Sequence, residues 1–578
     1  MSEKPPEWEI TIDRFDGFVP SWFSNDWPSV GTKYQASDMA DIDLTDPNRM
    51  KPGPAPENLR NGDQGNGDQE GAVTTLVKSF MRQVTSQGVS FAIGGDYLYN
   101  LSTNEVSLTG DWPHQILGVD SEGEDVIAYK GQLFYFYNWL ALKTPEGDIG
   151  MYDSDSGFTD DWGSTIPSGA AYLEYAPHQA INGGDDEVYF ANGHYVGKIS
   201  EIDGVYTLST QALNFWEDSE IMSLTWNENR IKIALNRPNC DGSIQSAIYN
   251  WNGYSSSWEG DPIEVKGRIG ALYTKNGIDY VWWRDVGTTG EFNFGYVSGT
   301  QVKGIKKCTG SLPLYYQVGE YKGFIAWMSD GLVYLHGQSD PESPVKFFQY
   351  TRSLYPNGTN GGLGMPFEEL LTASSFSTDD GINYSLAKAG SDYSDDSYWK
   401  TRVFPVMLPG YVSQVDKIQM NTETFPVGSK LETYFFYNGN CANEIIDSML
   451  YSATSSNTFH KVLNKSLKIE DFLLKLLWDN IGEITSVGVD SMGTGYTQGD
   501  VLTLIGGQGD ATVTVTEEID GMIYAVALLN GGTGYVVGTS AVTGGTGNDD
   551  AVIDISGVGH DTVKVRSILI KGHYVPEN

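Results

Sequence analysis

Residues 271–283 read ALYTKNGIDYVWW, a pattern typical of a β-hairpin. Two runs rich in aromatic and β-branched residues flank Asn276-Gly277, a pair that suits a type I′ turn because both central residues need positive φ. Asn192-Gly193 and Asp330-Gly331 predict the same turn. Five further stretches share this plan of strand, turn and strand: FAIGGDYLYNLS (91–102), EDVIAYKGQLFYFYN (124–138), EVYFANGHYVGKIS (187–200), SLTWNENRIKIAL (223–235) and GFIAWMSDGLVYLHG (323–337).

The spacing of these hairpins indicates a propeller. Their turns lie near positions 94, 131, 193, 228, 276 and 330, at intervals of 37, 62, 35, 48 and 54 residues. Four-stranded propeller blades recur at about 40–50 residues. We therefore predict an all-β chain with a β-propeller of six or seven irregular blades over residues 89–406. A pair of β-sandwiches is the alternative.

Two segments precede this region. Residues 1–70 are rich in proline and carry aromatic residues that need burial, which predicts an extended N-terminal arm lying on another surface of this chain or of a neighbour. Residues 71–88 follow, and six apolar residues in them recur at helical spacing, which predicts a connecting helix. These are Val73, Leu76, Val77, Phe80, Met81 and Val84.

The region after the propeller is again rich in predicted strands. Residues 407–480 together with 559–578 are expected to form a C-terminal β-sandwich. Residues 481–558 repeat internally: Gly-Thr-Gly-Tyr at 493–496 recurs at 532–535, and Gly-Gly-x-Gly at 506–509 recurs at 544–547. We predict a small inserted β-module of two repeats, in which neither repeat folds alone.

Composition excludes several classes of protein. The 578 residues carry 36 Lys and Arg against 75 Asp and Glu, a net charge of −39. This charge disfavours tight nucleic-acid binding, which depends on Lys and Arg at phosphates. The start, MSEKPPEWEI, shows no signal-peptide pattern, and no apolar stretch predicts membrane insertion. Cys240, Cys308 and Cys441 form no CxxC pair, which fits synthesis in a reducing cytoplasm.

Motifs of common catalytic sites are missing from the sequence, which contains no GxSxG and no HExxH. The glycine clusters are followed by predicted strands such as ATVTV (511–515), whereas a phosphate loop needs a helix N-terminus. We therefore predict no catalytic, cofactor-binding or metal-binding residue, no cofactor, and no enzymatic activity. The seven histidines are scattered: His114, His178, His194, His336, His460, His560 and His573.

The segment MYDSDSGFTDDWG (151–163) is the strongest candidate for a cation site. Among Asp153, Asp155, Asp160 and Asp161, the alternating carboxylates with a glycine resemble the first half of a calcium loop, but the closing bidentate Glu is absent. The segment also resembles the Asp-box turn of sialidase-like propellers. An acidic turn is the favoured interpretation, and cation binding at Asp153 and Asp155 stays open.

Sugar chemistry is the other alternative. A glycosidase needs two carboxylates about 5–10 Å apart in a cleft, and a chain with 75 acidic residues does not exclude such a pair. Four tryptophans could stack on sugar rings, although aromatic residues also pair across strands. They are Trp251, Trp258, Trp282 and Trp283.

Three stretches resemble the β-propeller structural proteins of tailed bacteriophages: ITIDRFDGFVPSWF near the start, VTTLVKSFMRQVTSQGVSFAIGGDYLYNLST (73–103) and AIYNWNGYSSSW (247–258). The paired GTGYTQGDVLTL and GTGYVVG units are similar to a small β-module of phage tail and baseplate proteins. The resemblance covers most of the chain. The sequence is shorter than many nozzle-type proteins, which leaves the position in the tail open.

The resemblance implies a structural virion protein of the phage tail, made in the host cytoplasm: a nozzle, conduit or adaptor ring that contributes to tail assembly and genome passage. It implies a homo-oligomeric ring with other tail proteins as partners and carries over no catalytic residue. The charge of −39 adds the hypothesis of an acidic lumen through which genomic DNA slides without sticking. The alternatives are a receptor- or glycan-binding tail module and a polysaccharide-degrading tail enzyme.

Overall fold

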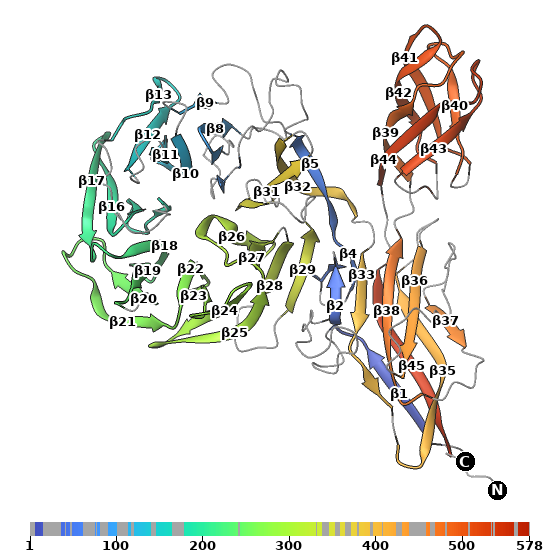
Figure 1. The fold of residues 1–578 in the computed structure, drawn as a ribbon, viewed down its shortest axis with the longest axis horizontal. Helices are drawn as coiled ribbons and strands as arrows, with labels where there is room; N and C mark the ends of the chain where they lie inside the picture. The colour runs from blue at the N-terminus through green and yellow to red at the C-terminus, as the bar shows by residue number, and fades with distance from the viewer. Residues whose placement is uncertain are drawn as a thin grey trace. The chain divides into compact units, whose positions relative to one another are not determined.

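The computed structural model confirms an all-β fold with a propeller and a sandwich, and it divides the chain into two compact units (Figure 1). One unit comprises residues 56–343 and 352–389, and the other comprises residues 1–55, 344–351 and 390–578. The structure describes residues 6–15, 36–40, 42–44, 46, 49–61, 76, 78–80, 91–100, 114–116, 121–139, 146–163, 178–240, 243–330, 332–337, 346–352, 359–364, 371–378, 381–393, 397–406, 408–423, 430–438, 458–462, 469–479, 483–506, 509–532, 535, 538–559 and 564–576.

Seven four-stranded antiparallel sheets form the propeller in the described part of the chain. Each blade is given from its inner to its outer strand. Blade 1 consists of β6 (Ser79–Phe80), β7 (Phe91–Gly94), β8 (Tyr97–Asn100) and β9 (His114–Gln115), and blade 2 of β10 (Ser121–Tyr129), β11 (Gln132–Trp139), β12 (Glu146–Asp153) and β13 (Gly157–Thr159). Blade 3 consists of β14 (Ala180–Asn182), β15 (Val188–Asn192), β16 (Tyr195–Ile202) and β17 (Val205–Asn214), and blade 4 of β18 (Glu220–Asn227), β19 (Arg230–Pro238), β20 (Ile244–Trp251) and β21 (Glu259–Val265).

Blades 5 to 7 complete the ring. Blade 5 consists of β22 (Arg268–Lys275), β23 (Ile278–Arg284), β24 (Glu291–Ser298) and β25 (Gln301–Thr309). Blade 6 consists of β26 (Val318–Tyr321), β27 (Phe324–Ser329), β28 (Leu332–Gly337) and β29 (Lys346–Arg352). Blade 7 consists of β30 (Thr359–Gly364), β31 (Leu371–Thr378), β32 (Gly381–Tyr393) and β5 (Pro54–Asn61).

The ring closes through a strand from near the N-terminus. The inner strands contact one another in sequence from β6 to β30, and β30 contacts β6 again. The outer strand of blade 7 is β5, which lies beside β32 in Figure 1 although roughly three hundred residues separate the two in sequence. A strand from near the N-terminus therefore completes the last blade of the propeller, and this pairing holds the two ends of the ring together.

Tight hairpins set the register within the blades. Asn276 and Gly277 have φ of 51° and 76°, which confirms the predicted type I′ turn, and Asp330 also has positive φ. At the third predicted turn the pairing of Asn192 with Tyr195 makes Gly193 and His194 the central residues. The prediction was therefore one residue early, because Asn192 is itself a buried strand residue.

Between the blades the core is apolar and rich in aromatic rings. Between blades 5 and 6, Trp282 packs 5.7 Å from Trp327, and Phe294 lies 4.7 Å from Trp327 and 4.8 Å from His336 (ring centroids). His336 is fully buried, and burial together with the charge of Lys275 lowers its pKa to about 3. The aromatic excess of the sequence thus fills the layers between blades.

The predicted connecting helix over residues 71–88 is wrong at its described centre. Ser79–Phe80 is strand β6, which pairs with β7, and the Lys78 amide donates to the Ile93 carbonyl at 2.8 Å. The side chains of Lys78 and Ser79 are buried with acidic partners on blade 2, which outweighs the helical spacing of the apolar residues. Apart from Leu76, the rest of the predicted helix lies outside the described residues.

The boundary predicted at residue 406 is also wrong. The last strand of blade 7 ends at Tyr393, whereas β33 (Tyr398–Thr401) and β34 (Phe404–Pro405) pair with β38 (Asp471–Asp479) in the second unit. Alternating apolar residues such as Trp399 suit either sheet, so periodicity alone did not assign them.

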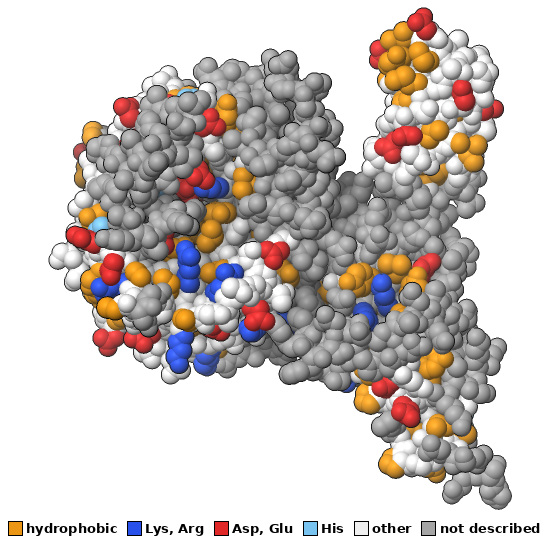
Figure 2. All heavy atoms as spheres, in the orientation of Figure 1, with side chains coloured by type: hydrophobic (Ala, Val, Ile, Leu, Met, Phe, Trp, Pro, Cys, Tyr) orange, Lys and Arg blue, Asp and Glu red, His pale blue; other side chains and the backbone are white. Residues whose placement is uncertain are grey.

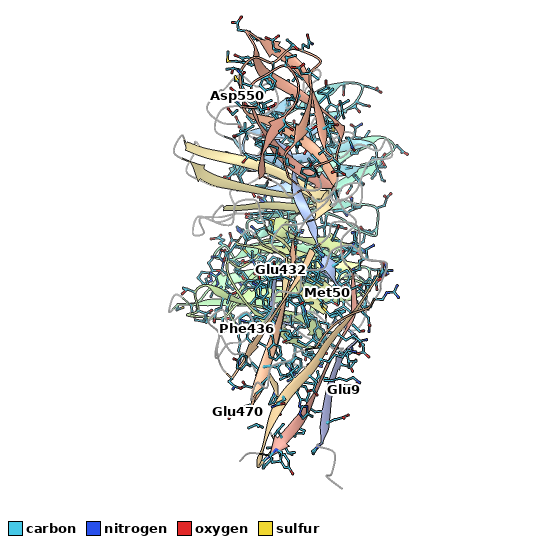
Figure 3. All side chains as sticks on the ribbon, turned by 90° about the vertical axis from the view of Figure 1, so that its right-hand side faces the viewer. Glu9, Met50, Glu432, Phe436, Glu470 and Asp550 are labelled. Carbon is cyan, nitrogen blue, oxygen red and sulfur yellow. The ribbon has the colours of Figure 1, made fainter. Side chains whose placement is uncertain are left out.

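Two sheets of the second unit pack as a sandwich. One has the order β1 (Glu7–Ile12), β45 (Val565–Pro576), β35 (Tyr411–Thr422) and β37 (Thr458–Val462). The other has the order β2 (Ala36–Ala40), β33, β38 and β34, with β36 (Lys430–Tyr437) also on β38. The Trp8 ring stacks 5.8 Å from Phe472, which joins the two sheets. Glu432 and Phe436, labelled in Figure 3, alternate with the buried Leu431 and Phe435.

The described parts of residues 1–70 are strands within the chain's own sheets. β1 pairs with β45 near the C-terminus, and β3 (Ile42–Asp43) pairs with β4 (Lys51–Pro52). Met50, labelled in Figure 3, bridges to Val565. The aromatic stretch at 16–27 lies outside the described residues.

The inserted module is a six-stranded sheet that curls on itself. Its order is β39 (Glu483–Ser491), β44 (Val552–Gly559), β43 (Gly538–Thr543), β40 (Val501–Leu504), β41 (Thr512–Ile519) and β42 (Met522–Asn530), and β42 also contacts β39.

The two Gly-Thr-Gly-Tyr tyrosines hold the module together by reaching into each other's repeat. The Tyr496 hydroxyl accepts the Ala551 amide at 3.3 Å, and the Tyr535 hydroxyl accepts the Ala511 amide at 3.2 Å. Glycine is required at Gly547, because a Cβ there would lie 2.3 Å from the Tyr496 ring. Each repeat therefore completes the core of the other.

Candidate functional site

A buried charged cluster occupies the centre of the propeller, near the start of the inner strands. Lys78 Nζ lies 2.9 Å from Glu124 Oε1 and also pairs with Glu122, both from β10. Lys78 is 8% exposed and Glu124 is 1% exposed. Burial by itself lowers the pKa of Lys78, but the charges of Glu124 and Glu122 outweigh it and hold that pKa above its usual value. The ammonium therefore stays charged.

Tyr315 reaches this cluster from the other side of the ring. It belongs to η2 (Tyr315–Gln317), a short 3₁₀ helix that precedes blade 6 and contacts β22 and β30. Its hydroxyl donates to the Glu124 carbonyl at 2.9 Å, and the side chain is 1% exposed. Blades 2 and 6 are not neighbours in the ring, so this hydrogen bond links η2 to a blade that is not adjacent to blade 6.

Hydrogen bonds extend the cluster to blade 3. Asn138 Nδ2 donates to Glu124 Oε1 at 3.1 Å, and Asn138 Oδ1 lies 2.6 Å from His178 Nε2. His178 Nδ1 faces the Ala191 carbonyl at 3.0 Å. Complete burial lowers the pKa of His178 to about 4. Asp125 adds a second link between blades, since its carboxylate accepts Ser79 Oγ and the Ala180 amide.

We call these residues the axial cluster, and their ion pairs and hydrogen bonds hold different blades together. Its members are Lys78, Glu122, Glu124, Asn138, His178 and Tyr315. A lysine beside glutamates could act as acid and base in an open cleft. Here Lys78 and Glu124 are buried, and the partly exposed Glu122 pairs with Lys78, so the charged groups of the cluster are engaged with protein partners. Among the described residues, no group of three or more His, Cys, Asp or Glu is arranged to hold a metal ion.

Glu220 is a further buried carboxyl on an inner strand of the propeller. It begins β18, is fully buried, and has no hydrogen bond to its carboxylate oxygens within the described part of the chain. Arg268 Nη2 lies 3.9 Å away. Burial raises the pKa of Glu220 to about 8 against the opposing charge of Arg268. The carboxyl is therefore largely protonated at neutral pH.

Glu220 gives the propeller a pH dependence of defined sign. Between its usual pKa of 4.5 and about 8, the folded chain holds a proton that the unfolded chain has lost. This contribution to stability is fully present below the lower value and is lost as pH rises through the upper one, by at most about 1.4 kcal/mol per pH unit. We expect Glu220→Gln to abolish this component in urea unfolding measured across that window. Equal slopes for variant and wild type would contradict the assignment.

The acidic segment 151–163 forms a hairpin turn between β12 and β13. Asp153 Oδ1 accepts the amides of Asp155 and Ser156, each at 2.8 Å, and these bonds together with one from Gln132 lower the pKa of Asp153. Asp160 lies elsewhere in the segment and binds His114 at 2.8 Å. The structure does not bring the four aspartates into one cation site.

The tryptophans considered for sugar stacking are mostly in the core. Trp251, Trp282 and Trp283 are 1%, 0% and 9% exposed, and Trp258 is half-buried against Phe215 at 5.3 Å. The glycine clusters of the module lead into strands β41 and β44, as expected for turns. Sequence reasoning missed the axial cluster, because its members come from segments that lie far apart in the chain.

The module carries an unusual surface. No Lys or Arg occurs between Lys475 and Lys564, while residues 482–558 contain ten Asp and Glu. Met492, Ile519 and Tyr524 are nevertheless 41%, 47% and 42% exposed at the β41–β42 hairpin end. Figure 2 shows hydrophobic side chains gathered at this end, beside acidic ones. Asp550, labelled in Figure 3, lies in the loop region, where it accepts the Thr494 amide at 2.8 Å.

Searches with family models and against curated proteins found no match to this chain. Among solved structures it is similar to Drosophila semaphorin 1a extracellular domains 1–2, at 10% identity and a TM-score of 0.34, over 56% of this chain and 88% of that one. It is also similar to a puromycin-hydrolysing peptidase of Mycobacterium tuberculosis, at 11% identity and 0.33, over 62% of each chain. A third is the soluble aldose sugar dehydrogenase of Escherichia coli, at 10% identity and 0.30, over 58% of this chain and 98% of that one.

Proposed function

We propose that this protein is a structural component of a bacteriophage virion, a nozzle, conduit or adaptor ring of the tail that contributes to assembly and genome passage. The observation that carries the proposal is the buried contact between blades at Glu124. This residue accepts the Tyr315 hydroxyl on its carbonyl and pairs with Lys78 through its carboxylate, and all three residues are buried. A propeller locked in this way serves as a rigid frame whose outer surfaces make the contacts.

The phage-like stretches quoted above support the same role. So does the charge of −39, which suits a lumen that does not hold DNA phosphate. In this proposal DNA passes between copies arranged in a ring and not through a single propeller. The ring and its neighbours in the tail are therefore part of the proposal.

Mass spectrometry of purified tailed phage particles that encode this chain tests the proposal. We expect the chain in every preparation, at several copies per particle, after nuclease treatment and density-gradient purification. Its absence from infectious particles would refute a structural role. Binding to glycan arrays, or release of reducing ends from host capsule, would favour the receptor-binding or enzymatic alternatives.

A further inference from the structure

We propose that copies of this chain join head to tail, with the β41–β42 hairpin end of the module of one copy seated on the blade 5 face of the next. This contact rests on the proposed ring and names the surfaces that build it. Contacts between two different surfaces of one chain generate a closed ring when the rotation between copies closes.

The donor surface combines exposed apolar side chains with acidic side chains that no Lys or Arg of the module neutralises. Ile519 and Tyr524 lie on the β41–β42 hairpin, and Met492 is held beside them because its carbonyl accepts the Ile523 amide at 3.0 Å. Exposed Asp490 and Glu517 flank this patch. An apolar centre with a charged rim is the usual composition of a protein interface.

The acceptor surface is the one blade whose sequence carries net positive charge. From the first residue of β22 to the last of β25 there are six Lys and Arg against three Asp and Glu, and Lys266 immediately precedes them. Each of the other six blade segments, counted in the same way, is negative overall. Figure 2 shows Lys and Arg side chains gathered over the strands that Figure 1 labels β22–β25.

A cleft at the junction of blades 4 and 5 offers a seat for the apolar side chains. It has a volume of 620 Å³, and its lining includes Lys266, Gln245 and Val286, with Glu264 and Asp285 as its acidic members. Val286 is 62% exposed, and Arg268 and Arg284 adjoin the lining residues in sequence. The cleft thus offers one exposed apolar side chain, Val286, and the lysine Lys266 beside two carboxylates, while the exposed Arg268 lies next to it in sequence.

The charge distribution points to a second copy as the occupant. A chain with a net charge of −39 repels its own copies over most orientations. The module contains no Lys or Arg, and blade 5 is the single blade with net positive charge. When these two surfaces meet, the charges of the two copies attract each other. Complementary charge at an interface also fixes the register of the two partners.

Charge exchange in the purified full chain tests the contact. Sedimentation at low salt should show self-association of the wild type that weakens as salt rises. We expect Lys266→Glu and Glu517→Lys each to weaken association about tenfold, and the double variant to recover most of the loss. Lys322→Glu, the same charge change on blade 6, is the control. Tyr524→Ala should also weaken association, with no change in the salt dependence.

Failure of the contact and failure of the virion role are distinguishable. A monomeric wild type, single variants that associate normally, or a double variant without recovery would overturn the proposed contact. The chain would still be found in particles if it were a tail protein that assembles through other surfaces. Melting curves of each variant identify one that fails to fold, in which case Asp490→Lys replaces Glu517→Lys and Lys266→Gln replaces Lys266→Glu.

Discussion

Replacing Glu124 by alanine should lower the free energy of unfolding of the propeller by about 3 kcal/mol, because the change removes the buried carboxylate beside Lys78 and leaves only the partly exposed Glu122 as its partner. Lys78 is 8% exposed, so water does not compensate the lost carboxylate. Asn138 also loses an acceptor at 3.1 Å. Urea unfolding followed by tryptophan fluorescence measures the loss, and hydrogen exchange in β10 and β14 localises it to the axis.

A double substitution distinguishes the cost of an unpaired buried charge from a general loss of stability. In Lys78→Met with Glu124→Leu both charges disappear, and apolar replacement of a buried pair is often close to neutral. The double variant should therefore be more stable than Glu124→Ala alone. If the single variant cost less than about 1 kcal/mol, or if the double variant were the less stable, the axial cluster would not lock the blades.

Tyr496→Ala should destabilise the inserted module by about 3–5 kcal/mol, the usual cost of removing a fully buried aromatic side chain. The side chain is 1% exposed and packs on Gly547 in the other repeat, so its removal opens the joint core of both repeats. Hydrogen exchange across residues 483–559 should rise in β44 as well as near the mutation, while peptides of the propeller stay unchanged.

Two matched variants control this experiment. Tyr524→Ala removes the same side chain from a position that is 42% exposed, and it should change module stability by less than about 0.5 kcal/mol. Tyr496→Phe keeps the ring but leaves the buried Ala551 amide without its acceptor, at a cost of about 1–3 kcal/mol. Equal effects of Tyr496→Ala and Tyr524→Ala would show that the repeats do not interlock.

The hairpins were predictable because their signals are local. The pair Asn276-Gly277 has positive φ at both positions, and the two runs that flank it are rich in aromatic and β-branched residues, as in a hairpin. The blade number stayed at six or seven because the outer strand of the last blade, β5, comes from the predicted N-terminal arm. Its prolines suit an edge strand but give no sign of a partner so distant in sequence.

The helix was wrongly predicted and the axial cluster was missed for one reason. In a helix Lys78 would lie off the apolar stripe as a solvated residue, and only its long-range partners Glu122 and Glu124 show that the segment is a buried strand. Tyr315 lies farther still along the chain from Glu124. A site built from segments brought together by ring closure leaves no spacing pattern in the sequence, whereas the acidic turn at Asp153 is local and was recognised as a turn.

Cryo-electron microscopy of intact tailed particles that encode this chain tests the proposed virion ring. We expect density for several copies of a seven-bladed propeller around a common axis, with acidic side chains facing the lumen between them. Particles with no such density, or a ring whose lumen is lined by Lys and Arg, would contradict it.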